Sequence, residues 1–61
     1  MKCAELYRLL IKEGWYPISQ KGSHVKMQHD EKKGIIIFPN HGSQEVGKGL
    51  EKKIKRDAGL K

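Results

Sequence analysis

The sequence has one cysteine, Cys3, and therefore cannot form an intramolecular disulfide bond. One cysteine and scattered histidines also lack the spacings of a zinc site, so we expect neither a metal nor another cofactor. No apolar run approaches the ~20 residues that a membrane-spanning helix needs, and the apolar segment of a signal peptide is missing as well. The sequence therefore predicts a cytoplasmic protein that has no contact with a membrane.

The chain is short, and its acidic residues are few. Its 61 residues suffice for one domain, residues 1–61, and a chain of this size buries only ~60% of the surface that its unfolded form exposes. We expect a marginally stable module that gains from a partner or from a very regular architecture. Seven Asp and Glu against 13 Lys and Arg give a net charge of +6. This positive charge favours nucleic acid as a partner, although it would attract an acidic protein equally well.

The hydrophobic pattern of the first half predicts one helix and then strands. Leu6, Leu9 and Leu10 recur at helical spacing within residues 2–13, and Gly14 stands where that helix would end. Pro17 cannot donate to a sheet ladder, so its strand should lie at an edge or carry a bulge. The predicted strands are 15–20, 23–29 and 35–38, of which the third is a continuous apolar run typical of a central or doubly covered strand.

A second helix is predicted to begin near Gly47 or Lys48 and to end at Gly59. Its apolar stripe comprises residues four apart, namely Val46, Leu50, Ile54 and Ala58. The order helix, three strands, helix predicts an α+β fold in which a three-stranded antiparallel sheet carries both helices on one face. The second helix also holds the densest basic charge, with four candidates for RNA binding: Lys52, Lys53, Lys55 and Arg56. A solvated helix face would carry such charges too, but it does not explain their sign imbalance.

The open face of such a sheet is where chemistry is expected. Strand alternation places Val25 and Met27 under the helices, and it places His24 and Lys26 on the outer face. An exposed imidazole beside an ammonium group can handle a phosphodiester, with His24 as the base that deprotonates an RNA 2′-hydroxyl. Lys21 and Lys26 would supply positive charge, and Gly22 would let the backbone approach the phosphate. The same pattern also fits an exposed strand histidine without a chemical role.

Two more histidines are candidates for assisting His24. His29 shares a face with Val25 and Met27, so it also fits a structural residue at the end of the strand. His41 follows Pro39 and Asn40 in a predicted loop, where it is a candidate second RNA ligand.

Several of these segments together carry a family resemblance that covers nearly the whole chain. They are the helix ending at Gly14-Trp15, the run Lys21-Gly22-Ser23-His24, His29, Pro39-Asn40-His41, and the closing helix with Leu50, Ile54 and Ala58-Gly59-Leu60. In these features the chain resembles the HicA toxins, the RNA-cleaving halves of bacterial toxin–antitoxin pairs.

The resemblance implies a fold like that of a double-stranded-RNA-binding domain, αβββα. It also implies that His24 is the catalytic residue, that messenger RNA is the target, and that a HicB-like antitoxin binds the toxin and blocks it. We expect a monomeric toxin that joins its antitoxin in a hetero-oligomer, with Lys21, Gly22, Ser23 and Lys26 as RNA-binding residues beside His24. Cys3 departs from the family, because related sequences often have a serine there that would cap the first helix, at a cost of ~1 kcal/mol or less.

Three functions are consistent with these features. The first is a metal-independent endoribonuclease that inhibits translation and growth. The second is a noncatalytic RNA- or DNA-binding module of the same shape, which would bind without cleaving. The third is an interaction partner that contributes only a basic surface to a protein complex.

Overall fold

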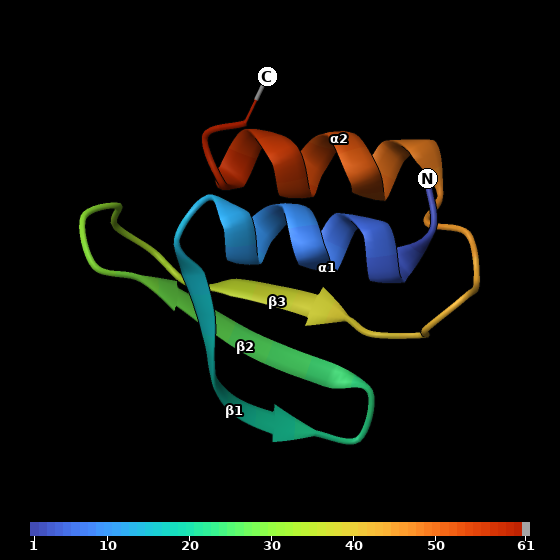
Figure 1. The fold of residues 1–61 in the computed structure, drawn as a ribbon, viewed down its shortest axis with the longest axis horizontal. Coiled ribbons are helices and arrows are strands. Elements are labelled where there is room, and N and C mark those ends of the chain that lie inside the picture. The colour runs from blue at the N-terminus through green and yellow to red at the C-terminus, as the bar shows by residue number, and fades with distance from the viewer. Residues whose placement is uncertain (61) are drawn as a thin grey trace.

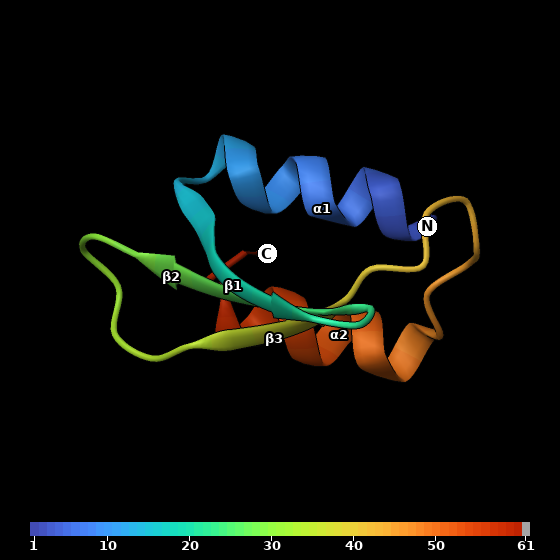
Figure 2. The same ribbon diagram turned by 90° about the horizontal axis from the view of Figure 1, so that it is seen from below.

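The computed structural model describes residues 1–60 and contains five elements in the predicted order. Helix α1 spans Cys3–Lys12, strands β1, β2 and β3 span Trp15–Lys21, His24–His29 and Ile36–Pro39, and helix α2 spans Lys48–Asp57. The antiparallel sheet has the order β1-β2-β3, and both helices lie on one side of it (Figure 1). Figure 2 views the molecule from the strand side, with α2 partly hidden behind β3 and α1 beside the strands in the view. The predicted αβββα fold, like that of a double-stranded-RNA-binding domain, is confirmed.

The hydrophobic core lies between the inner face of the sheet and the two helices. In β2, Val25 and Met27 are buried, whereas His24, Lys26 and Gln28 are exposed, as strand alternation predicts. Full burial of a large apolar side chain is worth ~1.5–3 kcal/mol, so this cluster is the main source of stability. Its buried members are Cys3, Leu6, Leu10, Trp15, Val25, Met27, Ile36, Phe38, Val46, Ile54 and Ala58.

Strand β3 lies at an edge of the sheet and is covered on one face only. Ile36 and Phe38 are buried, but Ile35 and Ile37 leave 47% and 51% of their surface exposed. The prediction of a central or doubly covered strand was therefore wrong, and β2 is the central strand. The alternation was hidden in the sequence because isoleucines occupy the outward positions as well as one of the inward ones.

Pro17 acts in β1 as its chemistry predicts. β1 is the other edge strand, and its register with β2 shifts between Pro17 and Ser19. The extra residue, Ile18, has no partner in β2 and stays exposed, which is the pattern of a β-bulge. Both alternatives predicted for this strand, an edge position and a bulge, are confirmed.

The start of α1 differs from the prediction made for Cys3. Lys2 is the N-cap, and its backbone N–H donates to the Glu5 carboxylate at 3.1 Å. Cys3 is the first residue inside the helix, and its side chain is buried. The predicted capping cost at Cys3 is therefore wrong, because the residue belongs to the core and not to the cap.

Helix α2 has a narrower apolar stripe than predicted. Ile54 and Ala58 are buried, but Leu50 is exposed, and Val46 is buried just before the helix begins. Gly59 follows the helix with φ +76°, in agreement with the predicted stop. Within residues 1–60, neither helix is long and apolar enough to cross a membrane.

Candidate functional site

The β1–β2 hairpin places His24 beside Lys21 on the outer face of the sheet, the face turned away from the helices. The register pairs His24 with Lys21 of β1 on one side and with Pro39 of β3 on the other. Side chains of directly paired residues point to the same face, with Cβ atoms about 4.5–5.5 Å apart. Because both His24 and Lys21 are exposed, a large ligand can reach the imidazole and the ammonium group together.

The turn of this hairpin contains Gly22 and Ser23. Gly22 has φ +61°, and in residues 1–60 only glycines have positive φ, which fits a type II′ turn with glycine first. A Cβ atom added at Gly22 would meet nothing within 4 Å, so its backbone is open to a ligand. The backbone oxygen of Ser23 accepts a hydrogen bond from the Asn40 N–H at 2.7 Å, which joins the turn to the segment after β3.

Lys26 completes a group that we call the hairpin site, comprising residues 21–24 and Lys26. It lies two residues after His24 on the same face of β2, paired with Ser19 of β1 and Ile37 of β3. The structure thus brings together five of the predicted site residues on one accessible surface. Exposed isoleucines beside them make this surface part basic and part apolar.

The segment after β3, residues 40–46, leaves the sheet at the hairpin end (Figure 1). Backbone hydrogen bonds tie it to the first turn of α1: Ala4 N–H donates to the Gly42 oxygen at 3.0 Å, and Cys3 N–H donates to the Gln44 oxygen at 2.9 Å. These bonds satisfy N–H groups that the helix itself leaves without partners. These bonds, with the one from Asn40 to Ser23, hold the backbone of His41 near the hairpin that carries His24, and they are long-range contacts that no local sequence pattern predicts.

His29 lies at the opposite end of β2, where its ring takes part in packing. Its Nε2 is 2.9 Å from the Glu13 backbone oxygen, and the N–H groups of Glu31 and Lys32 approach Nδ1 at 3.0 and 3.1 Å. A neutral ring with its proton on Nε2 satisfies all three contacts. The ring also meets Trp15 edge to face, with centroids 5.3 Å apart. The structure therefore separates His29 from the hairpin site by the length of the strand.

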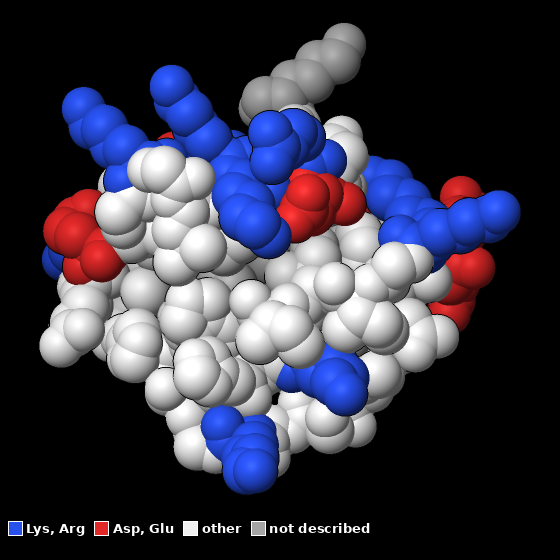
Figure 3. All heavy atoms as spheres, turned by 180° about the vertical axis from the view of Figure 1, so that it is seen from behind, with Lys and Arg blue, Asp and Glu red and all other residues white. Residues whose placement is uncertain are grey.

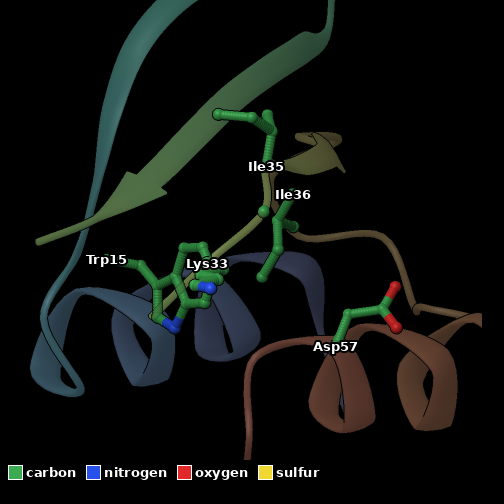
Figure 4. Close-up of a pocket in the computed structure, with 6 residues that line it drawn as sticks. Trp15, Lys33, Ile35, Ile36 and Asp57 are labelled. Carbon is green, nitrogen blue, oxygen red and sulfur yellow. The ribbon is translucent and has the colours of Figure 1, made fainter. Parts of the chain in front are cut away.

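A cavity of about 210 Å³ lies at this same end of the molecule, beside Trp15 and α2 (Figure 4). The Trp15 Nε1–H donates to the Ala58 backbone oxygen at 3.3 Å, and Lys32 Nζ donates to the same oxygen at 2.8 Å. None of the predicted site residues lines the cavity. Within residues 1–60, no group of three or more His, Cys, Asp or Glu side chains is placed to hold a metal ion.

The basic side chains of α2 form a second charged surface, at the top of Figure 3, and uncharged surface separates it from further basic side chains lower down. Lys53 pairs with Asp57 and Lys55 pairs with Glu51, each at 3.1 Å. The hydrogen bond from Lys55 lowers the pKa of Glu51 below its ordinary value. Lys52 and Arg56, in contrast, are exposed and have no acidic partner in the part of the chain that is described.

The direction of these side chains follows from the helical repeat. Lys52 and Arg56 lie two residues on either side of the buried Ile54, which places them on the opposite side of the helix. They therefore point away from the sheet. The structure does not bring the predicted α2 residues together with His24.

Comparison with known proteins agrees with this architecture. Residues 3–60 match a family described as the HicA toxin of bacterial toxin-antitoxin. The chain is also 41% identical over 61 residues to the probable mRNA interferase HicA of Pseudomonas fluorescens (strain Pf0-1), a match that covers 100% of this chain and 98% of that relative. The resemblance carried by the Gly22-Ser23-His24 run and the flanking helices is thus confirmed, and the chain belongs to the HicA family of bacterial toxins.

Proposed function

We propose that this chain is the toxin of a type II toxin–antitoxin pair, an endoribonuclease that cleaves messenger RNA without a metal ion and thereby inhibits translation and growth. The observation that carries the proposal is the exposed His24 imidazole on the outer face of the sheet, directly paired with Lys21. Membership of the HicA family and the relative named as an mRNA interferase support the same activity.

The proposed reaction is attack of an RNA 2′-hydroxyl on the adjacent phosphate. His24 removes the hydroxyl proton, and the ammonium groups of Lys21 and Lys26 stabilise the negative charge that grows on the phosphate oxygens. The open backbone at Gly22 and Ser23 lets the RNA strand approach the hairpin closely. Each of these steps uses side chains that the chain itself provides, and none requires a metal ion.

The proposed partners of this activity are messenger RNA and an antitoxin. The basic residues of α2, Lys52, Lys53, Lys55 and Arg56, would bind phosphates of the same RNA away from the cleaved bond. A HicB-like antitoxin would bind the monomeric toxin in a hetero-oligomer and keep messenger RNA from the hairpin site. The toxin would act in the cytoplasm, where its substrate is found.

The test is to incubate the purified chain and its His24→Ala variant with a messenger RNA in the presence of a chelator and to map the fragment ends. We expect cleavage by the unmodified chain alone, leaving 2′,3′-cyclic or 3′-phosphate ends and 5′-hydroxyl ends. Equal cleavage by both proteins would remove His24 from the mechanism. Binding of RNA by both proteins without cleavage would instead indicate the noncatalytic binding module.

A further inference from the structure

The proposed reaction has a second proton transfer that the hairpin site does not supply. When the phosphate bond to the departing 5′-oxygen breaks, that oxygen must receive a proton. We propose that His41, from the segment after β3, is the proton donor to this oxygen. This inference rests on the proposed role of His24 as the base.

The backbone places His41 one step beyond the pairing that holds His24. His24 pairs with Pro39, and the hydrogen bond from Asn40 N–H to the Ser23 oxygen extends the same antiparallel ladder by one residue. His41 comes next. Two residues along a strand and one strand across correspond to about 8 Å between the Cα atoms of the two histidines. Two imidazoles at that spacing can reach opposite sides of one phosphodiester.

β3 ends at Pro39, but its pairing with β2 continues to Asn40, and the same alternation continued by one residue would put His41 on the face that carries His24. Pro39 shares the outer face with His24 because the two are directly paired, and His41 is two residues after Pro39. Lys21 flanks His24 from β1, so the base lies between a cation on one side and His41 on the other. The leaving oxygen of an RNA lying across the hairpin site can therefore face His41.

His41 is also held in place while its ring stays available. The hydrogen bond from Asn40 to the Ser23 oxygen holds the backbone before His41, and the bonds from α1 to the oxygens of Gly42 and Gln44 hold it after His41. Its side chain is exposed, and within residues 1–60 its ring has no hydrogen-bond partner, in contrast to the ring of His29. Fixing a reacting group in position before the substrate binds lowers the entropic part of the barrier.

The other groups near His24 are less suited to this step. Lys21 and Lys26 are ammonium groups, and Ser23 offers a hydroxyl, whereas imidazole is the side chain that exchanges a proton most readily near neutral pH. In the balanced step, the 2′-oxygen bonds to phosphorus and passes its proton to His24. The bond between phosphorus and the 5′-oxygen breaks, and His41 gives its proton to that oxygen. The products are a 2′,3′-cyclic phosphate and a 5′-hydroxyl.

A sulfur substitution separates proton donation from binding or folding. A short RNA containing a mapped cleavage site is prepared with its 5′-bridging oxygen and, separately, with sulfur in that position, because a thiolate leaves without needing a proton. On ordinary RNA we expect His41→Ala to be slower by ~10²-fold or more, the usual size of a general-acid effect. On the sulfur substrate we expect its rate to come within about fivefold of the unmodified chain, because the step that needs the acid has been removed.

The comparison needs two matched variants. Ser43→Ala alters the same segment outside the proposed machinery, and it should cleave both substrates like the unmodified chain. His24→Ala should be slow on both, because sulfur does not replace the base. Equal loss by His41→Ala on both substrates would overturn the role of His41 while leaving that of His24 intact. Retained cleavage of both substrates by His24→Ala would instead remove His24 from the proposed mechanism, and with it the premise on which this inference rests.

Thermal unfolding of each variant shows whether it is folded at the assay temperature. His41→Gln, which keeps a polar side chain of similar size but cannot donate a proton as an acid, is assayed beside His41→Ala. We expect the same selective loss on ordinary RNA. Activity of His41→Gln close to that of the unmodified chain on ordinary RNA would also overturn the proposal.

Discussion

β2 begins and ends with a histidine, and the two imidazole rings differ in exposure and in hydrogen bonding. His24, at the first end, is exposed on the outer face, and its ring has no hydrogen-bond partner within residues 1–60. His29, at the last end, is half-buried, contacts three backbone groups and meets Trp15 edge to face. A histidine whose ring is fully occupied by the fold has no free nitrogen for a substrate. The comparison therefore favours His24 as the residue that reacts with a substrate. His29 has a structural role, because its ring connects the end of α1 to the β2–β3 loop.

The largest effect that we expect is a loss of the RNA cleavage rate when His24, at the N-terminal end of β2, is replaced. His24→Gln keeps a polar side chain on the outer face but cannot act as a base, so cleavage should fall by ~10²–10⁴-fold, as for other proton-transfer groups. The measurement is the initial rate of RNA cleavage, with circular dichroism to show that the fold is kept. Substantial activity in this variant would mean that His24 only binds the RNA.

The second largest effect should be a loss of folding stability when His29, at the C-terminal end of β2, is replaced. His29→Ala removes three hydrogen bonds and the contact with Trp15, which we expect to cost about 2 kcal/mol. For a chain of this length that corresponds to a fall in Tm of about 10 °C. His24→Ala, measured in parallel, should lose less than ~0.5 kcal/mol because the residue is exposed. Similar melting of the two variants would contradict the comparison.

A smaller effect is expected on α2, where free and paired basic residues stand side by side. Replacing Lys52 and Arg56 with alanine should weaken RNA binding and lower the slope of log affinity against log salt by up to about 2, one for each phosphate contact. The matched variant replaces Lys53 and Lys55, whose charges are already offset by Asp57 and Glu51. We expect this second double variant to change the slope less, as measured by salt titration of binding.

The smallest effect that we expect is that of replacing Glu51 on how the free energy of unfolding depends on pH. Lys55 lowers the pKa of Glu51 in the folded chain by a hydrogen bond, so the ionised pair stabilises the fold above the ordinary carboxyl pKa. That contribution is lost as the pH falls through the lowered pKa. Glu51→Gln should therefore be less stable than the unmodified chain at neutral pH and equal to it in strong acid, by urea unfolding at each pH. Glu31→Gln serves as the control, because the Glu31 carboxylate makes no ion pair in the described chain.

Local chemistry made most of the fold predictable. The spacing of Leu6 and Leu10, the alternation of Val25 and Met27, and the effect of Pro17 all act over a few residues, and each was confirmed. The prediction for β3 failed because Ile35 and Ile37 are apolar yet exposed, so composition alone concealed which face was covered.

The site was predictable only where its members are close in the sequence. The residues of the hairpin site lie within six positions of one another, so a single turn brings them together. The placement of His41 depends on backbone bonds from Asn40 to Ser23 and from α1 to Gly42, none of which leaves a mark in a local pattern. The α2 residues were predicted to bind RNA from their charge alone, and the direction of the helix puts them on a different surface from His24.

Because Cys3 is buried, the reactivity of its thiol reports on local unfolding of the chain. The thiol is the only one in the sequence, and it is enclosed at the first turn of α1. A water-soluble alkylating reagent can therefore modify it only when that turn opens, so the rate of labelling counts opening events without an added probe. Measured with and without a bound antitoxin, the same rate would give the protection that complex formation confers on the toxin against opening, and hence against proteases that attack the open form.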